Sequence, residues 1–389
     1  MNEAVKKQLF LFLRLVVSFG LIGYIFYSLS AEGKLSELPE YFSYANYWWF
    51  LAAAMLFLGL LVTGSYRWGM LLKAQGIHLS RSSVFMYYMI GMFFNNFLPS
   101  TVGGDFVKAY YLSRATGKTA GSFISVLMDR LMGMGGLCVV AVLACVLGGK
   151  ELWSNPRTHD YALYIFLIVG GVTGGLGLFL LMAFNDWIMN IFLKLARWGK
   201  IGEKIKEFHQ AVYVYKGHGK VLLQTLFIST VIWILIVLVS WMVYMAFHTG
   251  GASPAYPIGE AVPAVPAALT GASIPSASTV PSDSAGSPGY IAFIPIRYFY
   301  IFLPVISVIM SLPISFAGLG IREGVFMELF DTLPGISDVD ALIISLTFYF
   351  IFLAVSLLGG VIYIFKDKLR MHRDIIFPAP IKLRDGEEK

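Results

Sequence analysis

The stretch from Val221 to Phe247 reads VLLQTLFISTVIWILIVLVSWMVYMAF and contains no Asp, Glu, Lys, Arg or His. A helix rises by about 1.5 Å per residue, so a helix of this length exceeds the roughly 30 Å of bilayer hydrocarbon. The stretch therefore predicts a helix that crosses a membrane. Six further stretches are similarly apolar: Leu9–Leu29, Trp48–Leu72, Ala120–Leu147, Tyr161–Phe184, Tyr290–Leu312 and Ala341–Phe365.

The composition of the whole chain agrees with this prediction. Hydrophobic residues make up 57% of the 389 residues and charged residues only 13%, whereas about 25% is usual for a soluble domain. We expect an all-α fold, a polytopic membrane helix bundle of about 7–8 spanning helices, in a single domain over residues 1–373 with a polar tail over 374–389. The net charge of +6 lies in loops between apolar spans, so nucleic acid is excluded as a partner.

The distribution of basic residues predicts how the chain is oriented. The segment 186–220 is rich in lysine and carries apolar residues at helical spacing, which predicts an amphipathic helix on the cytoplasmic side. Lysines and arginines near both termini predict that both termini also lie on the cytoplasmic side. The segment 248–288 is rich in Pro, Ala and Ser and contains no Lys or Arg, so we expect a flexible external loop without a site.

Two apolar stretches are interrupted, Val84–Leu112 and Pro313–Phe330. Each interruption runs from Leu-Pro through a hydroxyl residue to two glycines and then to charged residues. Proline and glycine break helices, and free backbone groups are tolerated at membrane depth only when they are buried or line a cavity. We expect two broken or re-entrant segments related as repeats, of which Pro313–Phe330 completes a crossing and Val84–Leu112 returns to its own side.

Charged residues inside apolar spans are the functional candidates, because each disfavours insertion by roughly 2.5–3.5 kcal/mol at a helix centre. Adjacent residues on a helix point about 100° apart, so Asp129 and Arg130, like Arg322 and Glu323, should find partners on other helices. Asp105 and Lys108 have the spacing of a local pair. The alternative is that these charges form buried ion pairs that only fix the helix arrangement. The buried charges are Arg67, Asp105, Lys108, Asp129, Arg130, Arg297, Arg322 and Glu323.

The interruptions and charges together predict a cavity that binds a lipid headgroup. A helix start offers free N–H groups to an anion, and Arg130 and Arg322 would clamp a phosphate with forked donors. We expect no catalytic residue, metal or cofactor. The predicted cavity residues are Asn95, Asn96, Pro99, Thr101, Gly103, Gly104, Asp105, Lys108, Asp129, Arg130, Arg297, Pro313, Gly318, Gly320, Arg322 and Glu323.

These motifs resemble a known family. The stretch from Asn95 to Asp105, followed by Lys108-Ala109 and Asp129-Arg130, is similar to the lysylphosphatidylglycerol synthase transmembrane, flippase-like family, and Pro313–Glu323 is similar to its C-terminal signature. The resemblance implies a bacterial inner-membrane protein that moves lipids between leaflets. Its lipid partners would be phospholipids, aminoacylated phosphatidylglycerol, or polyprenyl-linked or hopanoid lipids. Oligomeric state is left open.

Two departures from the family and two rival functions remain. The full synthase adds a soluble aminoacyltransferase-like domain, but this chain stops shortly after Phe365, so we expect no synthase activity. The segment 248–288 is not part of the family pattern. A lipid flippase is our first hypothesis. The alternatives are an intramembrane headgroup transferase, with Asp105, Asp129 or Glu323 as its base, and a scaffold that transports nothing.

Overall fold

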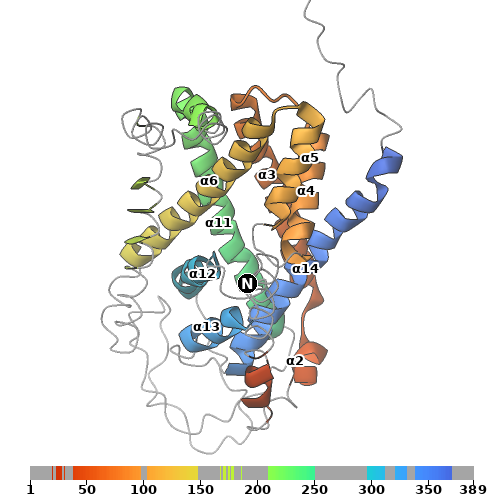
Figure 1. Cartoon of the computed structure of the whole chain (residues 1–389). Coiled ribbons are helices and arrows are strands. Elements are labelled where there is room, and N and C mark those ends of the chain that lie inside the picture. The colour runs from red at the N-terminus through yellow and green to blue at the C-terminus, as the bar shows by residue number, and fades with distance from the viewer. Residues whose placement is uncertain are drawn as a thin grey trace, which may run out of the picture.

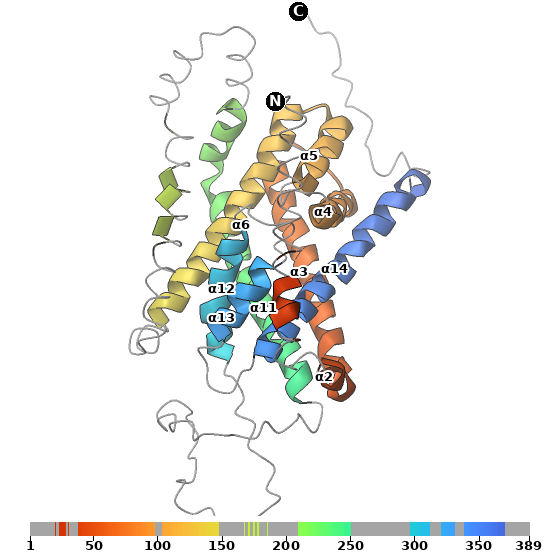
Figure 2. The same cartoon turned by 60° about the horizontal axis from the view of Figure 1, so that its bottom comes forward.

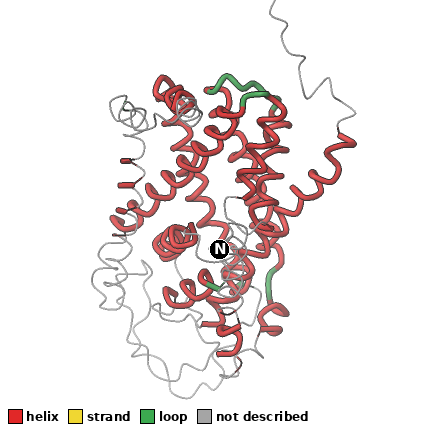
Figure 3. The backbone as a smooth tube through the Cα atoms, in the orientation of Figure 1, coloured by secondary structure: helices red, strands yellow, loops and turns green. Residues whose placement is uncertain are grey.

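A computed structural model describes residues 38–97, 103–147, 209–249, 296–311, 320–330 and 338–369, with isolated positions between 20 and 30 and between 167 and 185. Every regular element in these ranges is a helix, which confirms the predicted all-α membrane bundle (Figure 3). Most residues of the predicted spans Leu9–Leu29 and Tyr161–Phe184 lie outside the described residues. So do most of the segment 186–220, the loop 250–288 and the tail 374–389.

Four long helices form the frame of the part of the chain that the structure describes (Figure 1). Each is long and apolar enough to cross a membrane, and each begins and ends within a few residues of a predicted span. A short helix, α2 (Leu38–Tyr44), precedes the first, and a 3-10 turn, η2 (Val214–His218), precedes the third. The four are α3 (Tyr47–Ala74), α6 (Thr119–Leu147), α11 (Gly219–His248) and α14 (Asp338–Leu369).

The contacts between these helices fix their directions. Asn46 N, at the start of α3, donates to Ala246 O near the end of α11 at 2.7 Å, so the two helices are antiparallel. Lys118 Nζ, just before α6, donates to Gly76 O just after α3 at 3.0 Å. The end of α3 and the beginning of α6 therefore lie on one side, hereafter the basic side because Lys73, Arg81, Arg114 and Lys118 gather near it.

The first interrupted stretch forms a helical hairpin, α4 (Arg81–Phe97) and α5 (Gly103–Thr116), that enters from the basic side and returns to it. The two helices approach closely at Gly91 and Gly104. A Cβ on Gly104 would meet the Gly91 carbonyl oxygen and would lie 2.6 Å from Asn95 N. The expectation that Val84–Leu112 returns to its own side is confirmed, and residues 98–102 lie outside the described part.

The predicted span Tyr290–Leu312 and the second interrupted stretch together form another hairpin, α12 (Ile296–Ser311) and α13 (Ile321–Phe330). Tyr290–Leu312 thus supplies one arm of a hairpin and not the membrane-crossing helix that we predicted. The Phe299 ring lies 5.6 Å from Tyr244, near the end of α11, so α12 begins on the side opposite the basic one. The Phe330 ring packs back on Phe299 at 5.1 Å. The prediction that Pro313–Phe330 completes a crossing is therefore wrong. A helix of ten residues reaches only about 15 Å, half of the hydrocarbon thickness, and α13 instead returns to the side where α12 began.

The described helices make two units of the same plan with opposite orientation. The first unit is α3, the first hairpin and α6, and the second unit is α11, the second hairpin and α14. Since α3 and α11 are antiparallel, the hairpins enter from opposite sides, as Figures 1 and 2 show. The expected repeat thus takes the form of two inverted units.

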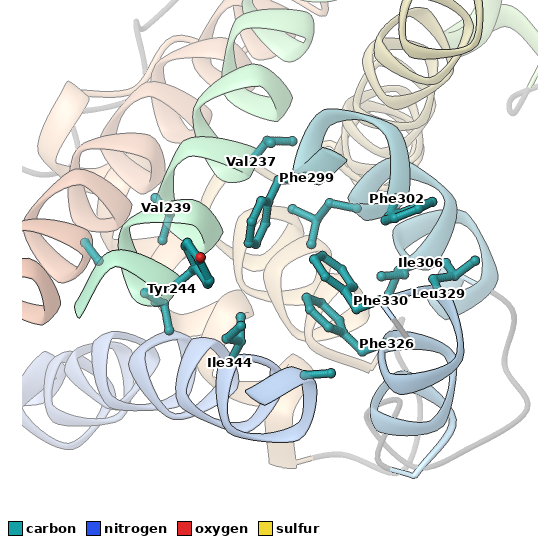
Figure 4. Packing of buried hydrophobic residues seen from close by; sticks show 14 of the residues in the cluster. Val237, Val239, Tyr244, Phe299, Phe302, Ile306, Phe326, Leu329, Phe330 and Ile344 are labelled. Atoms are coloured by element: carbon teal, nitrogen blue, oxygen red, sulfur yellow. The ribbon is translucent and has the colours of Figure 1, made fainter. Parts of the chain in front are cut away.

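An aromatic cluster holds the second hairpin against α11 and α14. The rings of Phe326 and Phe330 stack with centroids 4.6 Å apart. Both phenylalanines are almost fully buried, and Figure 4 shows them between Phe302 and Ile344. Lipid chains are as apolar as these rings, so the packing stabilises the hairpin through van der Waals contacts and holds α13 against α12.

Candidate functional site

A cluster of five charged side chains lies between the first hairpin and the long helices of the first unit. Its centre is Asp129, whose Oδ1 accepts from Arg67 Nε at 2.9 Å and whose Oδ2 lies 3.2 Å from Lys108 Nζ. Arg67 Nη1 also donates to Ser229 Oγ on α11 at 2.9 Å. This set, hereafter the first charge cluster, consists of Arg67, Asp105, Lys108, Asp129 and Arg130.

Lys108 is enclosed by aromatic rings as well as by carboxylates. Its Nζ lies 4.4 Å from the centroid of the Trp68 ring and 4.9 Å from that of Tyr88. The Lys108 side chain is 4% exposed. A buried ammonium loses its hydration, and the faces of aromatic rings replace part of it. The two rings and Asp129 therefore take the place of water around the Lys108 side chain within the bundle.

The cluster opens at Arg130. Arg130 Nε donates to Asp105 Oδ2, and Lys108 Nζ lies 4.0 Å from Asp105 Oδ1. The Arg130 side chain is 35% exposed, whereas that of Asp129 is 6% exposed. Three cations and two carboxylates meet in the cluster, so its formal net charge is +1. Arg130 pairs with Asp105 at the exposed end, and Arg67 and Lys108 share Asp129 at the buried end.

The tip of the first hairpin is held by two asparagines. Asn95 Oδ1 accepts from Gly104 N, in the first turn of α5, at 2.8 Å. Asn96 Nδ2 donates to Ser356 Oγ on α14 at 2.8 Å. Of the predicted site residues at this tip, Asn95, Asn96, Gly103 and Gly104 are described, whereas Pro99 and Thr101 lie outside the described residues.

A second group of polar side chains lies at the start of α13. Arg322 Nε donates to Ser345 Oγ at 3.1 Å, and its guanidinium lies 4.3 Å from the Tyr349 ring centroid. Arg322 Nη2 pairs with Glu323 Oε1, and Glu323 Oε2 accepts from Gly320 N at 2.7 Å. This set of Arg322, Glu323, Ser345 and Tyr349, hereafter the second charge group, is neutral.

The pairing of Arg322 with Glu323 corrects an expectation from the sequence. Adjacent residues on a helix diverge, but the carboxylate of Glu323 turns back toward Gly320 N, where the long Arg322 side chain reaches it. Asp129 and Arg130 behave as expected, since each pairs with another helix. Pro313 and Gly318 lie outside the described residues.

The structure places Arg130 and Arg322 in separate groups. The first hairpin reaches α14 at Ser356 and Arg322 reaches it at Ser345, and eleven residues of helix span about 16 Å. The described contacts therefore form two charge groups in place of the single clamp that we expected. Arg297 lies in the first turn of α12, with its guanidinium 5.2 Å from the Tyr298 ring centroid.

Several partners of the charged residues could not be found in the sequence. A lone serine or aromatic residue in an apolar span has no pattern that distinguishes a partner from ordinary packing. Arg67 was recognised as a buried charge, but its place beside Asp129 depends on how α3 and α6 pack. The partners added by the structure are Trp68, Tyr88, Ser229, Ser345, Tyr349 and Ser356.

Comparison with known proteins supports the resemblance. The family model described as "Lysylphosphatidylglycerol synthase TM region" matches residues 11–279, which include the whole first charge cluster. A UPF0104 membrane protein of Methanothermobacter thermautotrophicus is 26% identical over 215 residues, 51% of this chain and 63% of the relative, less than two thirds of its length. Another, from Methanocaldococcus jannaschii, is 20% identical over 255 residues, 62% of this chain and 72% of the relative. No solved structure matches. The chain is thus a multi-pass membrane protein that belongs to the lysylphosphatidylglycerol synthase TM region family.

Proposed function

We propose that this protein moves a charged or phosphate-bearing lipid between the two leaflets of a membrane, with its headgroup passing the first charge cluster. The observation that carries the proposal is a buried group of three cations and two carboxylates whose most exposed member is Arg130. A phosphodiester carries one negative charge, which balances the formal net charge of the cluster. The Arg130 guanidinium suits phosphate oxygens because its donors form a fork.

The position of the cluster supports transport over a purely structural role. An ionised side chain at membrane depth is costly, and such residues commonly mark the path of a substrate. Ion pairs that only fix helix packing would balance their charges, whereas the described members of this cluster have a formal net charge of +1. An anion that binds near Arg130 would balance this charge. A lipid headgroup that enters along the hairpin would supply that anion.

The inverted units give a second line of support. Many transporters consist of two units with opposite topology, and their sites lie where helices are broken. Here each unit contains one helical hairpin, and the first hairpin carries Asp105 and Lys108 into the cluster. Loops rich in Lys and Arg generally stay in the cytoplasm. We therefore assign the basic side, and both termini, to the cytoplasmic face of a bacterial inner membrane.

Reconstitution into liposomes tests the proposal. Purified protein is incorporated into vesicles that contain a fluorescent phospholipid, and the fraction reachable by a membrane-impermeant quencher is followed over time. The lipids are then extracted and their masses compared with those of protein-free vesicles. Protein-dependent movement of unchanged lipid supports transport.

Two other results would overturn the proposal. A changed headgroup mass would identify a transferase, with Asp105, Asp129 or Glu323 as the candidate base. Neither movement nor a mass change, together with partners that co-purify, would identify a scaffold.

A further inference from the structure

We propose that the second charge group is a second phosphate station, which receives a lipid headgroup from the leaflet opposite the basic side. This inference rests on the proposed function and deepens it, because it divides the path of the headgroup into two sites. The ligand is the phosphodiester of a phospholipid.

The two groups occupy equivalent positions in the inverted units. The third residue of the second half-helix is acidic in both hairpins: Asp105 in α5 and Glu323 in α13. Each carboxylate pairs with an arginine, Asp105 with Arg130 and Glu323 with Arg322. The helix that follows each hairpin supplies a contact at its twelfth residue, which is Arg130 in α6 and Tyr349 in α14. Both groups are therefore formed by residues at corresponding positions of the two units.

The depths of the two groups are also equivalent. Arg67 lies seven residues before the end of α3 on the basic side, and Ser345 lies seven residues after the start of α14 on the opposite side. Seven residues of helix correspond to about 10 Å. Each group therefore lies at a similar distance below its own side. A headgroup that leaves one leaflet meets the group nearest to that leaflet first.

Arg322 is prepared for an oxyanion. Tyr349 covers one face of the guanidinium, and Ser345 fixes Nε. Among the residues that the structure describes, Arg322 Nη1 has no hydrogen-bond partner. The carboxylate of Glu323 is held by Gly320 N, so it can stay in place when phosphate oxygens take over part of the Arg322 fork. Phosphate would bind through two parallel N–H donors, the geometry that arginine offers best.

The two stations differ in charge. Among the described residues, the formal charges of the first charge cluster sum to +1 and those of the second charge group sum to zero. A phosphodiester therefore binds more tightly at the first station, and water or a nearby cation must help to hold it at the second. A lipid that passes from the second station to the first gains electrostatic stabilisation within the bundle. This difference governs occupancy of the two stations, whereas net flow still follows the lipid gradient.

Leaflet-specific photo-crosslinking tests the inference. The probe is a phosphatidylglycerol with a photoactivatable group on its headgroup, introduced by lipid exchange into one leaflet of vesicles that hold protein of known orientation. Crosslinking follows on ice before the probe redistributes, and mass spectrometry maps the modified peptides. With the probe opposite the basic side, we expect crosslinks on α13 and α14 near Arg322. With the probe on the basic side, we expect crosslinks on α5 and α6.

Variants identify the group that holds the probe. R322Q should lower the α13–α14 yield about tenfold, the effect of losing one charge-assisted hydrogen bond, and leave the α5–α6 yield unchanged. R81Q removes an exposed positive charge from the start of α4, outside both groups, and is the control, with an unchanged yield. If R322Q does not fold, the mapping in the parental protein still decides the question.

The inference is overturned if probes in both leaflets map only to the first charge cluster, or if a folded R322Q keeps the parental α13–α14 yield. Because the crosslinks form before any movement, they are independent of transport. A protein that moves no lipid but crosslinks at both stations would refute the proposed function and leave the two binding sites established.

Discussion

Asp129 Oδ1 accepts a hydrogen bond from Arg67 Nε at 2.9 Å, and Arg67 Nη2 lies 2.9 Å from the same oxygen in an ion pair. The two residues are 62 positions apart and come from α3 and α6. The other oxygen of Asp129 faces Lys108. One carboxylate thus holds two buried cations, and its removal would leave both without their main counter-charge.

We predict that D129N is the most destabilising single change in the first charge cluster. Breaking a buried ion pair by removing one partner typically costs about 3–5 kcal/mol. Thermal unfolding of the purified protein in detergent measures the effect. The control S229A removes only one hydrogen bond to Arg67 and should cost about 1 kcal/mol. A D129N protein as stable as the parent would show that Asp129 is not the counter-charge of the cluster.

K108M should change the stability of the protein and the rate of lipid movement to different extents. Without Lys108 the four remaining charges still pair, Arg67 with Asp129 and Arg130 with Asp105, so the cluster becomes neutral. We expect K108M to lose less stability than D129N, because no buried charge is left without a partner. We also expect lipid movement to be about tenfold slower, because the charge-assisted attraction of the cluster for phosphate is lost. Unfolding and vesicle assays on one preparation measure both. Loss of stability equal to that of D129N would contradict this division.

The close approach of the first hairpin helices predicts a strong effect at Gly104. An alanine Cβ there would lie 2.6 Å from Asn95 N and would also meet the Gly91 carbonyl oxygen, both of them backbone atoms that cannot move independently. G104A should therefore destabilise the protein by about 1–3 kcal/mol, as overpacking does. The matched control is G324A in α13, where a Cβ meets no atom within 4 Å and alanine is the better helix former.

The link between Asn96 and Ser356 should couple the first hairpin to the second unit. Their side chains form a 2.8 Å hydrogen bond between residues 260 positions apart, and Asn96 is buried. In a double-mutant cycle of N96A and S356A, we expect a coupling energy of about 0.5–1.5 kcal/mol in unfolding. A coupling near zero would mean that the tip of α4 and α14 are held together by packing alone.

The sequence predicted an element of the fold correctly where the apolar run was long. The spans that became α3, α6, α11 and α14 were found because long uncharged stretches have few alternatives in a membrane. Both interruptions were found from proline and glycine. The direction of α13 was missed, because the sequence does not show that Phe330 packs on Phe299.

The charged residues of the site were visible in the sequence, but their grouping was not. Asp105, Lys108, Asp129 and Arg130 stand out because ionised groups are rare in apolar helices. Which of them meet depends on contacts between residues as distant as Arg67 and Ser229. The separation of Arg322 from Arg130 likewise follows from the inverted packing of the two units, which no local spacing encodes.

The central claim is that the first charge cluster carries a lipid headgroup, and the rate of lipid movement in vesicles with R130Q tests it most directly. R130Q removes the most exposed cation of the cluster and brings its formal net charge to zero. The control R114Q removes an arginine that contacts Tyr110 at the surface of α5. We predict movement about tenfold slower in R130Q than in the parent, and parental rates in R114Q. A correctly inserted R130Q protein that moves lipid at the parental rate would contradict the claim.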